Sequence, residues 1–216
     1  MSRRVLFLRS KSPAGIEPRI DKEARALANA GYDVTVLLWD RALEHLPSEV
    51  REGYRIERIR TRASYGGPDL AVRLPLWWLR SFLQIARERP DVVHAIDFDS
   101  VIPAVFSKQI VGHRLVYEIF DFYADMIALP LSSGVRAFLA RRERRAILAA
   151  DLVILADFAR QGQLGDARPA RVIEVMNVPE ERPVSRKKAT EFLVFYGGMI
   201  ARDRGLADLV AVCEAS

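Results

Sequence analysis

Cysteine is almost absent from this sequence, and histidine is nearly as scarce. The 216 residues include one cysteine, Cys213, so no disulfide can form within the chain, and a reducing compartment such as the cytoplasm is expected. The three histidines, His45, His94 and His113, are scattered along the chain. Because a zinc site needs several cysteine or histidine ligands held together, the sequence predicts no metal site.

Long hydrophobic runs are also missing. No stretch is long and apolar enough to cross a bilayer, so any membrane contact would be peripheral. The apolar run at residues 5–8 is short and is followed by Arg9 and Lys11, which a secretion signal would not have. We therefore expect a cytoplasmic protein, and contact with the inner face of the cytoplasmic membrane remains an open alternative.

The charge balance is basic, with a formal net charge of +5 and an isoelectric point near 9.6. This balance favours an anionic partner, such as a diphosphate, acidic lipid headgroups or nucleic acid. The arginines are not interleaved with aromatic residues, so we expect no nucleic-acid partner. Arg141, Arg142, Arg144 and Arg145 lie on a predicted helix at residues 135–150. They are typical of a solvated basic face, or of a helix lying against acidic membrane lipids.

Residues 91–125 hold the most informative pattern in the chain. Two short apolar runs, at residues 92–93 and 115–117, are each followed at once by ionisable side chains. These side chains are His94, Asp97 and Asp99 after the first run, and Glu118 and Asp121 after the second. Ligands bind beyond the carboxyl ends of parallel strands in open α/β sheets, so the pattern predicts a site there. The alternative is that these residues only end strands and cap helices, as Asp99 could.

The rest of the chain alternates predicted strands and helices, which indicates an α/β fold with a Rossmann-like parallel sheet and helices on both faces. No G-x-G-x-x-G follows the first strand, so a nicotinamide or flavin cofactor is not supported. Predicted strands occupy residues 5–8, 34–39, 54–59, 151–155, 172–175 and 192–196. Predicted helices occupy residues 20–30, 70–89, 100–111, 135–150, 157–163 and 206–212.

A change in composition divides the chain into two parts. Residues 179–190 are rich in proline and charge and almost free of apolar residues, as in an interdomain linker. We expect one domain at residues 1–178 and an incomplete second α/β domain at residues 191–216, because one strand and one helix cannot bury a core.

Five motifs then suggest a family: DVVHAID, RLVYEIFDFYADM, AADLVILAD, VIEVMNVP and FYGGMIARDRGL. In this order and spacing they resemble the retaining nucleotide-sugar glycosyltransferases of the GT-B fold, and in particular their family 4-like N-terminal domain. The resemblance implies two Rossmann-like domains facing across a cleft. The first would hold mainly the acceptor, and the second mainly a nucleotide-diphosphate sugar, which is a co-substrate; no cofactor is implied.

The resemblance also assigns roles to individual residues. The family's V-H-x-H-[DE] segment is matched by His94 and Asp97, but its second histidine is Ile96 here, which transfers that role to Asp97 or Asp99. Arg204 stands at a lysine position and would contact the diphosphate. The implied catalytic residues are Asp97, His94 and Glu118; the acceptor-binding residues are Gly15, Asp99, Asp121 and Tyr123; the donor-binding residues are Asn177, Gly197, Gly198 and Arg204. Asp97-Phe98-Asp99 has the D-x-D form of a metal site in another glycosyltransferase fold, but we expect no metal here, because it leads from a parallel strand into a helix.

Two functions remain open at this stage. The first is the acceptor-side half of a hexosyltransferase in cell-surface polysaccharide or glycolipid synthesis, inactive without its donor domain. The second is a truncated, non-catalytic module that binds a glycan, a lipid-linked acceptor or a partner subunit.

Overall fold

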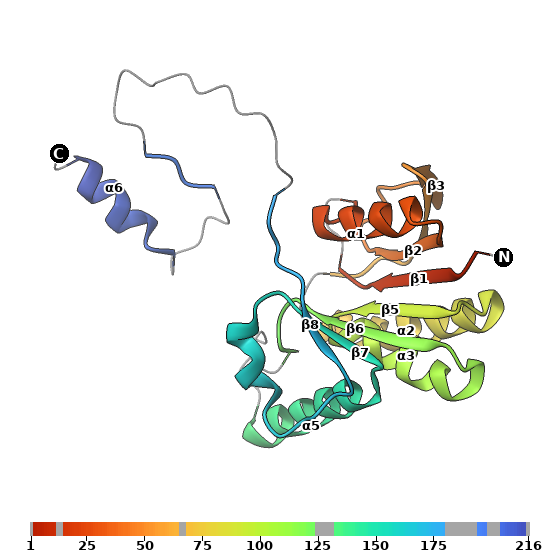
Figure 1. The fold of residues 1–216 in the computed structure, drawn as a ribbon. Helices are drawn as coiled ribbons and strands as arrows, with labels where there is room; N and C mark the ends of the chain where they lie inside the picture. The colour runs from red at the N-terminus through yellow and green to blue at the C-terminus, as the bar shows by residue number, and fades with distance from the viewer. Residues whose placement is uncertain are drawn as a thin grey trace. The chain divides into compact units, whose positions relative to one another are not determined.

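The structure is a computed structural model, and it describes residues 2–11, 15–64, 68–123, 132–179, 194–197 and 204–214. The chain forms two compact units, Met1–Val178 and Pro179–Ser216. The first unit is an α/β domain built on a single mostly parallel sheet, which confirms the predicted fold class (Figure 1). Residues 180–190 of the linker expected at residues 179–190 lie outside the described residues, so the predicted domain limits stay a prediction.

The sheet has eight strands within the described residues, in the order β3-β4-β2-β1-β5-β6-β7-β8. All neighbouring strands are parallel except β3 and β4. The strand bounds are β1 Arg4–Arg9, β2 Asp33–Asp40, β3 Ser48–Arg51, β4 Tyr54–Arg60, β5 Val92–Ile96, β6 Arg114–Ile119, β7 Leu152–Leu155 and β8 Val172–Glu174. The helix bounds in the first unit are α1 Pro18–Asn29, α2 Pro68–Glu88, α3 Phe98–Val111 and α5 Ser133–Ala149, with a 3-10 helix, η1, at Phe158–Leu164.

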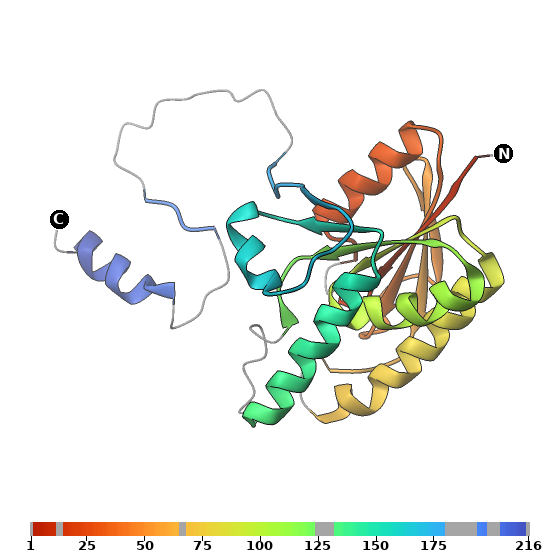
Figure 2. The ribbon, with the colours of Figure 1, turned by 60° about the horizontal axis from the view of Figure 1, so that its bottom comes forward.

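Alternating side chains of β1 belong to two hydrophobic cores on opposite faces of the sheet. Leu6 and Leu8 join a core beneath α2, α3 and α5, whereas Val5 and Phe7 join a smaller core beneath α1. Figure 2 shows α2, α3 and α5 together on one side of the strands and α1 on the other. Chain order explains this arrangement: right-handed crossovers put helices on opposite faces when the order of strands reverses, and here it reverses between β1 and β5.

Strand β3 was missing from the sequence-based prediction. It pairs antiparallel with β4 through a turn at Glu52 and Gly53, whose φ angles of 41° and 89° suit a two-residue hairpin. Its alternation is hard to recognise because three of its four residues are exposed. It ends the sheet with a short charged edge, which discourages pairing with other chains.

The second unit is described only in short pieces. Helix α6 spans Leu206–Glu214, in agreement with the helix predicted at residues 206–212. Residues 194–197 are not in a strand, contrary to the strand expected at residues 192–196. A strand needs a hydrogen-bonded neighbour, and the described part of this unit offers none. No helix in the described residues is long and apolar enough to cross a membrane.

Candidate functional site

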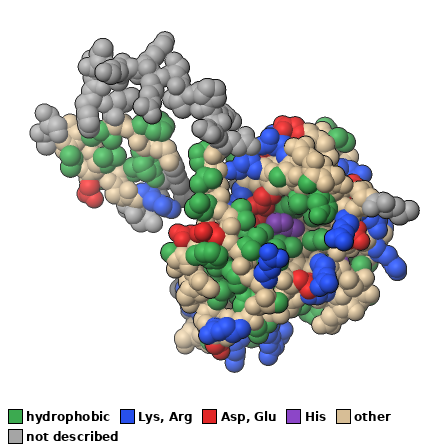
Figure 3. Space-filling model, in the orientation of Figure 1, with side chains coloured by type: hydrophobic (Ala, Val, Ile, Leu, Met, Phe, Trp, Pro, Cys, Tyr) green, Lys and Arg blue, Asp and Glu red, His purple; other side chains and the backbone are tan. Residues whose placement is uncertain are grey.

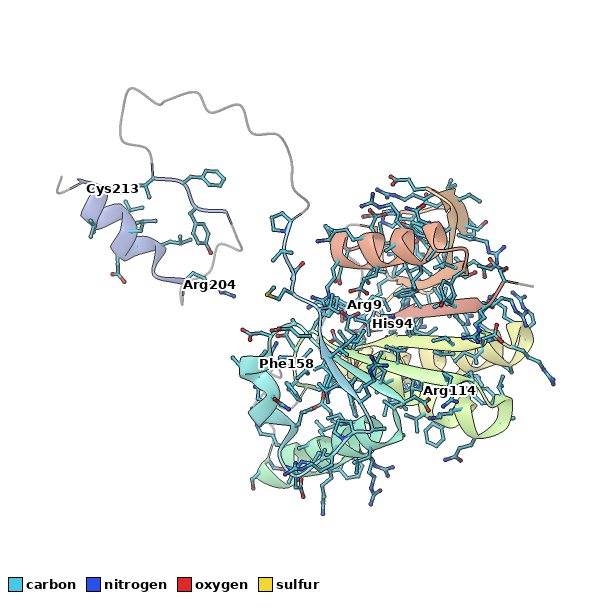
Figure 4. The ribbon with its side chains drawn as sticks, in the orientation of Figure 1. Arg9, His94, Arg114, Phe158, Arg204 and Cys213 are labelled. Carbon is cyan, nitrogen blue, oxygen red and sulfur yellow. The ribbon has the colours of Figure 1, made fainter. Side chains whose placement is uncertain are left out.

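The loops after β1, β5 and β6 meet at the carboxyl edge of the sheet. We call the group formed there by Arg9, Ser10, Asp97, Asp99 and Tyr123 the edge cluster. It joins residues about ninety positions apart, because β1 and β5 are neighbours in the sheet and run parallel. Arg9 ends β1 and is only 4% exposed (Figure 4). The predicted position of a site at this edge is therefore matched by a concentration of charge.

Asp97 connects these loops to one another. Its Oδ1 accepts hydrogen bonds from the backbone N–H of Phe120 at 2.9 Å and of Asp121 at 3.4 Å, and its Oδ2 pairs with Arg9. Its backbone has φ 61° and ψ 169°, a region that almost only glycine adopts, at a cost of about 1–3 kcal/mol. Both oxygens are engaged, so this carboxylate acts mainly as a hydrogen-bond acceptor that fixes the start of α3 and the loop after β6.

Asp99 has a less satisfied environment. The Ser10 hydroxyl donates to its Oδ2 at 3.1 Å, whereas its Oδ1 is buried with no hydrogen-bond partner among the described residues. Burial raises the pKa of Asp99, although the Ser10 hydrogen bond and the charge of Arg41 oppose this. Burial and the nearby Asp99 carboxylate raise the pKa of the Tyr123 hydroxyl to about 12. Asp99 thus lies beside Ser10 and Tyr123, and its Oδ1 is buried with no partner at hydrogen-bond geometry among the described residues.

His94 and Glu118 belong to a second group, beneath α1. This α1 cluster consists of Arg19 and Glu23 from α1, His94 from β5 and Glu118 from β6. Glu118 is 0% exposed; its Oε1 accepts from Arg19 Nε at 2.6 Å, and its Oε2 lies 2.9 Å from His94 Nε2. Both residues were expected to follow their strands, but they lie within β5 and β6, because each strand continues past its apolar run.

Glu23 and Glu118 in the α1 cluster share Arg19 as a partner, and their pKa values shift in opposite directions. Burial, followed by the charge of Glu118, raises the pKa of Glu23 to about 8. Burial opposes ionisation of Glu118 as well, but the His94 hydrogen bond and the charge of Arg19 outweigh it and lower the pKa of Glu118. The pair therefore holds one proton near neutral pH, on Glu23.

Glu23, His94 and Glu118 also have ligand atoms within 4.8 Å of one another, a spacing that could hold a cation. The Arg19 guanidinium already neutralises Glu118 and would repel a second positive charge beside it. We therefore assign no metal to this cluster.

The stability of the protein should decrease as pH rises from 6 to 8. Glu23 is protonated in the folded protein in a pH range where the unfolded chain, with an ordinary value of 4.5, has lost that proton. Its stabilising contribution is therefore complete below pH 4.5 and is lost as pH rises towards 8. Chemical denaturation should show a loss of up to about 1.4 kcal/mol per pH unit.

The matched control for this effect is Glu23→Gln, which should remove the slope. Burial lowers the pKa of His113, so His113 costs stability only when pH falls below 6.5. That contribution is common to both proteins and cancels in their difference. A Glu23→Gln protein with the slope of the wild type would contradict the assignment of the shared proton.

A shallow groove adjoins the α1 cluster on the same face of the sheet. Its volume is about 360 Å³, and Glu23 and His94 lie among otherwise mostly apolar lining residues from β1, β5, β6, β7 and α1. A histidine is visible among hydrophobic side chains in Figure 3. His94 stacks on the Phe7 ring with centroids 4.4 Å apart and is 5% exposed, so it is held in place by packing.

The remaining predicted site residues are dispersed. Gly15 has φ 89°, which favours glycine, and lies in the loop between β1 and α1. Asp121 is exposed, 3.5 Å from Arg160, and Asn177 is exposed after β8. Gly197 and Arg204 belong to the second unit, and Gly198 lies outside the described residues. Their donor-binding roles therefore stay predictions.

Three charged residues of this region were not identified from the sequence. Arg9 and Arg19 each bind an acid about ninety to a hundred positions away, a pairing that no local pattern reveals. Glu143 is 3% exposed and accepts from the Tyr117 hydroxyl at 3.2 Å and the Tyr123 N–H at 3.1 Å. Its position did carry a signal, because it lies four residues after Leu139 and four before Ile147, on the core face of α5.

Comparison with solved structures shows the same fold at low identity. A sucrose-phosphate synthase from Thermosynechococcus elongatus aligns over 81% of this chain and 48% of its own, with a TM-score of 0.65 and 14% identity. A domain of that enzyme aligns over 82% and 91%, with a TM-score of 0.63 and 12% identity. Anabaena HepE, solved with UDP and glucose, aligns over 81% and 44%, with a TM-score of 0.55 and 19% identity. The chain thus spans less than half of the two longer proteins.

The sequence itself identifies the family. No curated protein sequence gives a significant match. The family model described as glycosyl transferase 4-like domain matches residues 14–178, which include β2 to β8 and both the edge cluster's acids and the α1 cluster. The chain therefore belongs to the glycosyl transferase 4-like domain family, and its fold is that of the GT-B glycosyltransferases.

Proposed function

We propose that this chain is the acceptor-binding half of a hexosyltransferase. It would transfer a hexose from a nucleotide-diphosphate sugar to a glycan or lipid-linked acceptor in cell-surface polysaccharide or glycolipid synthesis. The observation that carries the proposal is the edge cluster, where the half-buried Asp99 has one buried oxygen without a partner among the described residues, at the ligand-binding edge of a parallel sheet. Family membership supports the reaction class.

The donor is proposed from the second part of the chain and from the solved relatives. HepE has been solved with UDP and with UDP-glucose. Arg204 is exposed two residues before α6 and would meet a diphosphate. The backbone of Gly197 and Gly198 would also approach the diphosphate, and Asn177 would lie at the hinge. Departure of the diphosphate leaves positive charge on the sugar, which nearby carboxylates would stabilise.

The acceptor residues have a more specific proposed arrangement. The Asp99 carboxylate orients the acceptor hydroxyl, and Tyr123 lies beside it, while Gly15 and Asp121 border the same edge. Asp97 contributes negative charge and fixes the two loops. His94 and Glu118 act as positioning residues, because Glu118 is fully buried and His94 nearly so. None of these roles needs a metal or a cofactor.

The test is to measure release of nucleoside diphosphate from nucleotide sugars, with and without candidate acceptors. A chain extended through a full donor-binding half should show turnover, and the 216-residue chain alone should show none above background, because donor contacts are incomplete. Turnover by the short chain alone would refute the claim of incompleteness. An extended chain that binds glycan or lipid-linked acceptors without turnover would instead favour the non-catalytic module.

A further inference from the structure

Helices α2, α3 and α5 lie on the face of the sheet opposite α1 (Figure 2). Side chains of these three helices line an open groove. Its volume is about 440 Å³. The lining residues come from α2, α3 and α5 and are Trp78, Phe98, Ile102, Val105, Phe106, Phe138, Leu139, Arg142, Arg145 and Ala146. Except for the two arginines, the lining is entirely apolar, so the groove suits a hydrocarbon ligand better than a sugar.

Large apolar side chains at the groove face solvent. Phe106 is 58% exposed and Phe138 47%, and Ile110, one turn beyond Phe106 on α3, is 73% exposed. Single exposed apolar residues are common, but aromatic and aliphatic residues gathered at one groove mark a surface that is covered in use. The groove therefore needs an apolar occupant.

The charge around the groove has one sign. Arg142 and Arg145 line it, Arg141 and Arg144 are exposed on the same helix, and the Arg142 guanidinium lies 5.1 Å from the centre of the Phe138 ring. The only acids on α3 and α5 are Asp99 and Glu143, and both point inward, toward Ser10 and Tyr117. Arg144 pairs with Asp166, whereas Arg142 and Arg145 have no acidic partner among the described residues. An apolar slot beside these two arginines is complementary to an anionic amphiphile.

We propose that this groove takes an acyl chain of an acidic membrane lipid, whose headgroup pairs with Arg142 and Arg145. The domain would then rest on a membrane with α3 and α5 against the lipid. A basic helix alone is also consistent with a solvated surface. The exposed aromatics and the groove, which lie beside the arginines, favour insertion into the lipid layer over a purely electrostatic contact.

The back wall of the groove is shared with the edge cluster. The Phe98 ring packs on Tyr123 with centroids 4.8 Å apart, and Trp78 Nε1 donates to the Asp99 carbonyl at 2.8 Å. A membrane on this face would therefore bring a lipid-linked acceptor close to Asp99. That consequence rests on the proposed function, whereas lipid binding itself does not, so the two can fail separately.

Quenching of tryptophan fluorescence tests occupancy of the groove. The chain has three tryptophans; Trp39 and Trp77 stack on each other in the core, and Trp78 lines the groove. Vesicles of phosphatidylglycerol and phosphatidylcholine with brominated acyl chains should quench the emission of the intact chain. Trp78→Phe should remove that quenching. Brominated vesicles of phosphatidylcholine alone should quench the emission of either protein only slightly.

Vesicle sedimentation tests the charge and the aromatics separately. Arg142→Gln with Arg145→Gln should weaken binding to the acidic vesicles about 25-fold, since each basic residue at such a surface contributes about a fivefold factor. Phe106→Ser with Phe138→Ser should weaken it too and remove the quenching. The matched control, Arg87→Gln with Arg114→Gln, removes two charges from arginines that do not line the groove, and it should bind almost as the wild type does. Thermal melts verify that each variant is folded.

Three results would overturn the proposal. One is equal binding to neutral and acidic vesicles, and another is sedimentation without any quenching of Trp78, which would mean a surface contact that leaves the groove empty. The third is that the protein does not bind vesicles but forms dimers, and that Phe106→Ser with Phe138→Ser abolishes the dimers. The groove would then be a protein interface.

Discussion

Glu118→Leu should lower the free energy of unfolding by about 3 kcal/mol. Glu118 is fully buried and is the main partner of Arg19, whose side chain is 6% exposed. Removing one member of a buried ion pair leaves the other charge desolvated without compensation, which costs about 3–5 kcal/mol. We expect the lower value because Glu23 lies 3.2 Å from Arg19 and would ionise in place of Glu118. Urea denaturation at pH 7 measures the difference.

The matched control is an exposed ion pair on the same domain. Asp166 is 84% exposed and lies 3.3 Å from Arg144, so Asp166→Asn should have little effect on stability. Adding Arg19→Met to Glu118→Leu should recover part of the loss, because no charge then remains buried at that position. A Glu118→Leu protein as stable as Asp166→Asn would show that the α1 cluster does not support the fold.

Asp99→Asn, made in a chain extended through a full donor-binding half, should reduce kcat/KM by about a hundredfold or more. Asparagine keeps the size of the side chain and can still accept the Ser10 hydroxyl. It removes the negative charge and the proton-accepting capacity of the oxygen that is without a partner. Stability should change little, because burial raises the pKa of this carboxyl and its charged form is therefore disfavoured.

The comparison for this variant is Asp97→Asn. Asp97 has both oxygens engaged by Arg9 and by backbone N–H groups, so its replacement should lower the melting temperature as well as the activity. Asp99→Asn should lower activity alone. Full activity in Asp99→Asn, with a folded protein and saturating donor, would contradict the acceptor role of Asp99.

Much of the sheet could be predicted from short apolar runs with turn residues between them. Those runs mark the buried centres of strands, and they predicted β1, β2, β5, β6 and β7 in their order along the chain. They underestimated strand length wherever a buried polar residue continues the strand, as His94 and Glu118 do. A charged residue inside a strand looks like a strand end until its distant partner, here Arg19, is known.

The location of the candidate site could be predicted from the sequence, but its hydrogen bonds and ion pairs could not. The carboxyl edge follows from topology, so Asp97 and Asp99 could be placed there. Which carboxylate has a raised pKa depends on burial and on partners about ninety positions away; for Asp99 burial raises the pKa, and the hydrogen bond from Ser10 opposes this. Glu143 shows the converse, since helical spacing alone puts it on the inner face of α5 despite its arginine neighbours.

The backbone at Asp97 has a consequence for how the site comes into being. Its unfavourable torsion angles are held by a contact with Arg9, which lies 88 positions earlier in the chain. Before β1 docks beside β5, that turn has its hydrogen bonds to the loop after β6 but lacks the contact with Arg9. The edge cluster should therefore be complete only after β1 takes its place between β2 and β5, and a chain that lacks residues 1–9 would lose both Arg9 and a central strand of the sheet.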